Sequence, residues 1–201
     1  MEIIYPFFIA FIMVFIAELG DKTQLMVLSF SGTLKARTIL FGIALGSLFS
    51  HGLAITFGSS IGLLGNQDIH NFLKIVTYCS FILVGIFSLL PKKEKISPNS
   101  DSKEGLIKKV SNLRMNYIII IALSIMIGEL GDKTFLASIG FGFEYPNSKL
   151  FLILGAILGM VVSDSIAIIF GKFLSKHISE EMMKKLSGIL FLIFGIVGFL
   201  F

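Results

Sequence analysis

Long apolar segments separated by polar connections run through the whole sequence. A helix needs about 20 mostly apolar residues to cross the hydrocarbon core of a bilayer, and lipid offers no hydrogen-bond partner for backbone groups outside a helix. Six segments approach or exceed this length, with the approximate bounds Ile3–Phe30, Thr38–Leu63, Phe72–Leu90, Asn116–Phe141, Leu150–Phe173 and Leu186–Phe201. The pattern predicts an all-α integral membrane protein with six transmembrane helices.

The composition agrees with this class and excludes several others. Hydrophobic side chains make up 55% of the 201 residues and charged ones 15%, whereas about a quarter of a typical soluble domain is charged. The net charge of +4 therefore does not indicate a nucleic-acid partner, and too little polar sequence remains for a soluble catalytic domain. Cys79 is the only cysteine, which excludes an intramolecular disulfide. We expect no enzymatic activity and no bound cofactor.

Basic residues are concentrated in alternate connections between the apolar segments. Thirteen Lys and Arg residues lie in the connections after the first, third and fifth segments or, as Lys172 does, at their edge, and only Lys74 and Lys149 lie on the other side. Because basic loops stay in the cytoplasm, we expect both termini to face outward. Residues 91–115 form the extended polar segment, which we expect to be a cytoplasmic basic linker; within it, Gly105–Arg114 is either a surface amphipathic helix or irregular.

The two halves of the sequence repeat each other. The hexapeptide ELGDKT occurs at residues 18–23 and again at 129–134, and Gly42 and Gly46 align with Gly155 and Gly159. Residues 1–90 and 116–201 each hold three expected spans, so the second copy must enter the membrane in the opposite sense. Inverted repeats of this kind are typical of transporters that bind their substrate between the repeats near the membrane midplane.

The hexapeptides place ionisable groups inside apolar segments, where an unpartnered charge is costly. In a continuous helix Glu18 and Asp21 would share a face; alternatively, the helix opens at its glycine and aims backbone carbonyls at a cation. If both copies meet, four carboxylates surround one volume: Glu18, Asp21, Glu129 and Asp132. Such an oxygen-rich site favours Ca²⁺, Mg²⁺ or Mn²⁺.

Further side chains support this hypothesis. Thr23 and Thr134 add hydroxyl groups, and the carbonyl of Gln24 is a possible ligand whose counterpart is Phe135. We interpret Lys22 and Lys133 either as self-neutralising ion-pair partners or as groups that hold a carboxylate until a metal ion arrives.

Proton coupling follows from the same chemistry, because protons and a metal ion compete for carboxylate oxygens. Asp164 lies within the fifth segment and His51 at the aligned position of the second. Each is a candidate for proton transfer, or alternatively a hydrogen-bonded packing residue.

With two ELGDKT copies, six expected spans and a basic central segment, the sequence resembles the Gdt1-type cation/proton antiporters, a family that includes Golgi manganese transporters and bacterial manganese exporters. The family hallmark is Glu-x-Gly-Asp-(Lys/Arg)-(Thr/Ser), once in each of two three-helix repeats. The resemblance implies export of Mn²⁺, or in some members transport of Ca²⁺, in exchange for protons. It places the metal ligands at Glu18, Asp21, Glu129 and Asp132, and it implies a prokaryotic plasma-membrane protein.

Three other hypotheses remain, namely an exporter of small solutes, an intramembrane enzyme, and a scaffold or channel subunit. A small-solute exporter of the amino-acid type also has six helices and would use the carboxylates to hold an amine. An intramembrane metal-dependent enzyme would use them to activate water, but the sequence shows no nucleophile–base arrangement.

Overall fold

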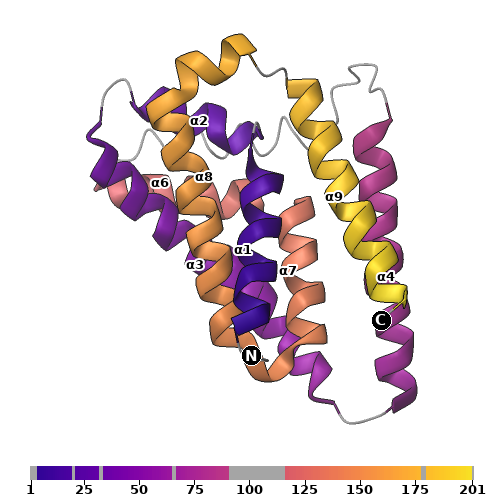
Figure 1. Ribbon diagram of the computed structural model, residues 1–201. Helices are drawn as coiled ribbons and strands as arrows, with labels where there is room; N and C mark the ends of the chain where they lie inside the picture. Colours follow the sequence, from indigo (N-terminus) through magenta and orange to yellow (C-terminus); the bar gives the residue numbers. More distant parts are fainter. Residues whose placement is uncertain are drawn as a thin grey trace.

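The computed structural model describes residues 4–19, 21–31, 34–64, 67–90, 116–177 and 180–200. This part of the chain is helical, as the apolar segments predicted (Figure 1). The elements are α1 (Ile4–Glu18), α2 (Lys22–Ser31), α3 (Ala36–Gly62), α4 (Gln67–Leu89), α6 (Tyr117–Glu129), α7 (Lys133–Glu144), the 3₁₀ turn η1 (Pro146–Ser148), α8 (Lys149–His177) and α9 (Glu180–Leu200). The expected linker and its surface helix lie outside the described residues.

The first and fourth apolar segments are each divided into two helices. The break after α1 and the break after α6 both fall within an ELGDKT copy. Among the described residues, two helices are long and apolar enough to cross a membrane, Ala36–Gly62 and Pro146–Ile169. The shorter apolar helices are Ile4–Glu18, Lys74–Leu89, Tyr117–Glu129 and Lys185–Leu200. The arrangement of six spans as an inverted repeat therefore stays a prediction.

The most extensive helix contacts join the first half of the chain to the second. Helix α1 packs along α8, α3 packs along both α6 and α7, and α4 packs along α9. Figure 1 shows α4 and α9 side by side, and α1 beside α8. Each half thus builds its interior against the other half.

Matched glycine pairs make two of these contacts possible. Gly42 and Gly46 of α3 face α6, and Gly155 and Gly159 of α8 face α1. A Cβ atom at Gly46 would lie 2.7 Å from the carbonyl oxygen of Ala122, and one at Gly159 would lie 2.6 Å from that of Phe11. Small residues four apart let helix backbones approach closely in membrane proteins, so the aligned glycines have the same packing role.

We expect Gly46→Ala to destabilise the protein, because the added methyl group meets a backbone carbonyl that cannot turn away. Overpacking of this kind costs about 1–3 kcal/mol, which corresponds to a fall in melting temperature of roughly 2–12 °C. Gly52→Ala on the same helix is the control, since its Cβ would have only Leu48 at 3.8 Å. The comparison is made by thermal unfolding in detergent; equal melting temperatures for the two variants would contradict this account of the packing.

The interior is apolar at most positions but also holds a group of polar side chains. Met13, Ile121, Ile125 and Met160 are completely buried. The buried polar residues near the two helix breaks and on the helices packed against them are Glu18, Gln24, Ser47, Ser50, His51, Ser124, Glu129, Thr134, Ser138, Ser163 and Asp164. Buried polar groups are costly without partners, so this part of the fold is a candidate for a functional site.

Candidate metal centre

Each ELGDKT copy lies where one helix ends and the next begins. Glu18 and Glu129 are the last residues of α1 and α6. The backbone N–H of Asp21 donates to the carbonyl of Glu18 at 3.2 Å, and that of Asp132 donates to the carbonyl of Glu129 at 3.0 Å. In the second copy Gly131 has φ +75°, a conformation that glycine adopts without strain. The alternative of one continuous helix with Glu and Asp on a shared face is therefore wrong; the opened form is what the structure shows.

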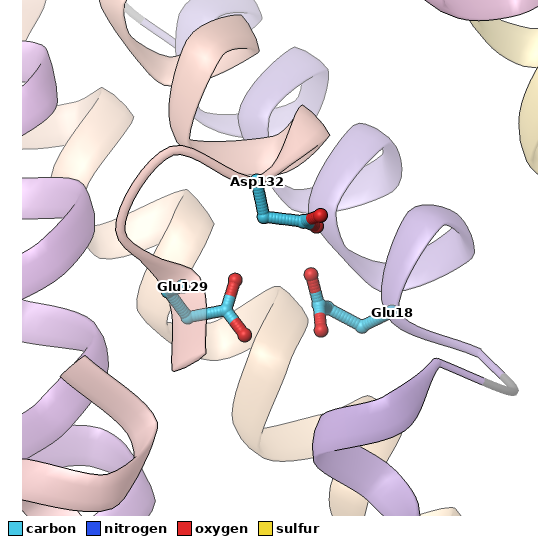
Figure 2. A group of neighbouring side chains, drawn as sticks. All are labelled: Glu18, Glu129 and Asp132. Atoms are coloured by element: carbon cyan, nitrogen blue, oxygen red, sulfur yellow. The ribbon is translucent and has the colours of Figure 1, made fainter. Parts of the chain in front are cut away.

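Three carboxylates from the two turns converge on one volume. Oxygen atoms of Glu18, Glu129 and Asp132 lie within 4.8 Å of one another. Figure 2 shows the three side chains pointing toward each other, Glu18 from one motif and the other two from the second. Glu18 and Glu129 are each 1% exposed. The structure thus brings together three of the four expected carboxylates.

The spacing of these oxygens suits a hard cation. Calcium–oxygen bonds of about 2.3–2.6 Å place ligands on opposite sides of the ion roughly 5 Å apart, and magnesium bonds place them closer. Two ionised carboxylates 4.8 Å apart repel each other by about 3 kcal/mol at an effective dielectric constant near 20. Three of them therefore require protons or a cation in the same volume. Glu18 also has a buried oxygen, Oε1, with no hydrogen-bond partner among the described residues.

The helix ends add to this preference. The C-terminal ends of α1 and α6 coincide with Glu18 and Glu129, and a helix C-terminus carries a partial negative charge. Two such ends beside three carboxylates disfavour an anion and favour a positive ion.

A threonine hydroxyl orients each buried glutamate. Thr23 donates to Oε2 of Glu18 at 3.1 Å, and Thr134 donates to Oε2 of Glu129 at 3.0 Å. Both hydrogen bonds join residues five apart across the turn. Each motif thus contains the same hydrogen bond between its threonine and its glutamate.

The lysine of the second motif contacts the first motif. Nζ of Lys133 lies 3.5 Å from Oδ2 of Asp21. The sequence spacing indicated pairing with Glu129 four residues earlier; the ion pair instead crosses between the motifs, because the broken helix removes the regular i, i+4 geometry. Asp21, the fourth expected carboxylate, is therefore held by Lys133 beside the group of three. The side chain of Lys22 lies outside the described part of the chain.

Gln24 connects α2 to α8. Its Nε2 donates to the carbonyl oxygen of Ser163 at 3.2 Å and contacts the Ser163 hydroxyl oxygen at 2.9 Å. The amide is thus anchored on the second half of the chain, which gives it a structural function that the ligand hypothesis did not include.

His51 and Asp164 occupy the interiors of α3 and α8. Nδ1 of His51 lies 2.9 Å from the hydroxyl of Ser138 on α7. Asp164 is 1% exposed, and neither of its carboxylate oxygens has a hydrogen-bond partner in the described structure. The two candidates for proton transfer therefore differ: the histidine is hydrogen-bonded and the aspartate is not.

The sequence analysis did not predict that Ser138 and Ser163 form hydrogen bonds between helices, with His51 and Gln24 respectively. Features of the sequence pointed to both serines. Ser138 follows Thr134 by four residues and so shares its helix face, and Ser163 precedes Asp164 as Ser50 precedes His51.

Comparisons with known proteins agree with the chemistry of this centre. A family model described as "Divalent cation/proton antiporter GDT1" matches residues 6–96 and 117–200. Each matched segment contains one ELGDKT copy. No solved structure matches the chain.

Individual relatives come from bacteria and from plant chloroplasts. A Vibrio cholerae protein named "Putative manganese exporter" is 27% identical over 182 residues, covering 90% of this chain and 84% of that protein. The Arabidopsis thaliana "Protein PAM71-homolog, chloroplastic" is 28% identical over 217 residues, covering 94% of this chain but 58% of that protein. A GDT1-like protein of Synechocystis sp. is 25% identical over 198 residues, with 93% of each chain covered. The chain thus spans most of its bacterial relatives and about three fifths of the chloroplast protein.

Proposed function

The chain belongs to the divalent cation/proton antiporter GDT1 family, and from this premise we propose that it exports Mn²⁺ in exchange for protons. The observation that carries the proposal is the convergence of Glu18, Glu129 and Asp132 from two copies of one motif. A group of buried carboxylate oxygens has the ligand chemistry of hard divalent cations. We propose Mn²⁺ as the transported ion because the name of the Vibrio relative specifies manganese. Ca²⁺ is the alternative, since the same oxygen ligands would accept it.

We assign the ion to a site of four carboxylates, Glu18, Asp21, Glu129 and Asp132. Asp21 joins the other three when it leaves Lys133, which lies 3.5 Å away in this structure. The lysine thereby holds a carboxylate while the metal is absent and releases it when the metal binds. Thr23 and Thr134 fix the orientation of the two glutamates.

Exchange follows from competition for the same oxygens. Metal binding requires deprotonated ligands and so releases protons, and proton binding displaces the metal. We infer that one three-helix repeat rocks against the other so that the shared site opens to one side of the membrane at a time. In this scheme the first motif gates the cytoplasmic side and the second the outer side.

The membrane that houses the protein is part of the proposal. We place it in the plasma membrane of a prokaryotic cell, with both termini outside and residues 91–115 in the cytoplasm. The family is not confined to that membrane, since relatives include proteins named as chloroplastic.

Reconstituted vesicles test the proposed function directly. The purified full chain is placed in liposomes with an internal pH-sensitive dye, and proton movement is followed after Mn²⁺, Ca²⁺, Mg²⁺ or lysine is added outside. We expect proton release coupled to Mn²⁺ uptake, a weaker response or none with Mg²⁺, and no response to the amino acid. Proton movement with lysine and none with any metal would favour the amino-acid type of exporter instead.

Thr134→Val is expected to weaken Mn²⁺ binding about 10- to 100-fold, as loss of groups that orient metal ligands usually does. The substitution keeps the shape of the side chain and removes the hydroxyl that donates to Glu129. Calorimetric titration of the detergent-solubilised protein measures the affinity. Thr56→Val on the exposed face of α3 is the control; equal affinities in the two variants would remove the positioning role of Thr134.

A further inference from the structure

We propose that Asp164 carries a proton of the exchange on a carboxyl group separate from those that bind the metal. The inference rests on the proposed function and deepens it, because it divides the exchange between a metal site and a neighbouring proton site.

Asp164 lacks a hydrogen-bond partner in the described structure, whereas the residues on either side of it both form hydrogen bonds. The preceding residue, Ser163, is bonded to Gln24, and the following residue, Ser165, donates to the carbonyl of Val161 at 2.6 Å. Asp164 itself is 1% exposed, and both of its carboxylate oxygens lack a hydrogen-bond partner in the described structure. An unpaired charge is costly in such a place, so we infer that Asp164 is neutral while the site holds no metal ion.

Asp164 lies near the carboxylate group but is not one of its members. Asp164 lies within electrostatic range of Glu129 but outside the set of oxygens that lie within 4.8 Å of one another. Its helix, α8, packs along α1, which ends at Glu18. Asp164 is thus close enough to sense the charge of the metal site without being one of its ligands in this structure.

In the described part of the molecule, the ionisable groups on the helices packed against α8 form no ion pair or hydrogen bond with Asp164. These groups are Tyr5 and Glu18 on α1, Lys22 on α2, Arg37 and His51 on α3, and Lys133 and Glu144 on α7. Three of them are engaged elsewhere: His51 with Ser138, Lys133 with Asp21, and Glu144 with Lys74 at 3.7 Å. The side chain of Lys22 is not among those described.

These observations define a proton step. When a divalent cation occupies the carboxylate group, its positive charge stabilises an ionised Asp164 through the low-dielectric interior. The O–H bond of Asp164 breaks, the electron pair stays on the oxygen, and the proton passes to water on the side to which the site is open. When the cation leaves, the unpartnered carboxylate takes up a proton again from the opposite side. One proton is thereby exchanged for each passage of the ion, in addition to those displaced from the ligands.

Asp164→Asn tests the division of roles, because the amide keeps the shape of the carboxyl group and cannot release a proton. In proteoliposomes we expect the variant still to bind Mn²⁺, with an affinity that depends less on pH than that of the wild type, and to exchange internal for external radioactive Mn²⁺ at equal pH. We expect its Mn²⁺ accumulation under a pH gradient to fall, with one proton fewer exchanged per ion than in the wild type. Ser187→Ala, which alters a buried hydroxyl on α9, is the control and should keep all three properties.

Two results would overturn the inference. One is Mn²⁺ accumulation in Asp164→Asn with the same number of protons per ion as in the wild type. The other is loss of Mn²⁺ binding and of exchange in a folded, monodisperse variant, which would make Asp164 a ligand instead. Failure of the proposed function is distinguishable, because the wild type itself would then neither bind Mn²⁺ nor exchange it.

A measurement on the wild type does not depend on the folding of any variant. A hydrophobic carbodiimide reacts with protonated carboxyl groups in membranes, and mass spectrometry of peptides locates the product. We expect Asp164 to be labelled in the metal-free protein and labelling at this residue to be lost at saturating Mn²⁺. Labelling that persists at saturating Mn²⁺, or that never reaches Asp164, would contradict the proton step.

Discussion

Glu129→Gln is expected to lower Mn²⁺-dependent proton flux in proteoliposomes by about 100-fold or more. The substitution removes one negative charge and one strong ligand from a group of three carboxylates within 4.8 Å of one another. Loss of a residue that merely orients a ligand already costs about 10- to 100-fold in metal affinity, and loss of the ligand itself costs more. The amide is isosteric and still offers an oxygen to the hydroxyl of Thr134, so the fold should survive.

Glu144→Gln provides the matched control for this result. Glu144 is the last residue of α7 and pairs with Lys74 at 3.7 Å, away from the carboxylate group. This variant should transport at the wild-type rate.

Glu18→Gln should reproduce the loss expected for Glu129→Gln, because the two glutamates occupy equivalent places in the two motifs. Unchanged flux in both glutamate variants would end the assignment of the site.

Lys133→Met is expected to destabilise the metal-free protein and to enlarge the stabilisation that Mn²⁺ provides. Asp21 loses its cationic partner at 3.5 Å, in a pair whose side chains are only 18% and 22% exposed. Breaking a buried ion pair costs about 3 kcal/mol, or roughly 6–12 °C in melting temperature. A metal ion no longer has to displace the lysine, so Mn²⁺ should restore more stability than it adds to the wild type.

Thermal unfolding with and without Mn²⁺ measures both parts of this expectation. Lys74→Met is the control, because it breaks an ion pair of the same type with Glu144 outside the carboxylate group. Its response to Mn²⁺ should equal that of the wild type. A smaller Mn²⁺-induced rise in Lys133→Met than in the wild type would show that the lysine supports metal binding rather than competing with it.

The sequence was informative wherever the chemistry was local. The charged hexapeptides predicted that Glu18 and Glu129 would occupy one site, and the structure brings their carboxylates together. The threonine two residues after each aspartate predicted a hydroxyl beside the carboxylates, and each threonine bonds its own glutamate. The threonine bonds depend on only six adjacent residues, so their spacing was enough, whereas the meeting of the two glutamates followed from the duplication of the motif.

Features that depend on the packing of distant segments could not be predicted in the same way. The contact between Lys133 and Asp21 joins residues on different motifs, whereas sequence spacing only suggested pairs within one motif. Whether the helix opens at its glycine was undecided, because a glycine equally permits close packing. Helices such as α6 are apolar on nearly every face, so no pattern indicated that Gly42 would meet α6 or that Gly155 would meet α1.

The packing of the first half of the chain against the second half has a consequence for biosynthesis. The helices of residues 4–90 make their main contacts with helices that leave the ribosome later. At about 5–20 residues per second, translation of the following hundred residues takes on the order of ten seconds. During that time Glu18 is part of a nascent chain in which Glu129 and Asp132 have not yet been synthesised. Newly made chains therefore face their greatest risk of degradation or mispairing before α6 and α8 arrive, and a chain truncated after residue 90 should not accumulate.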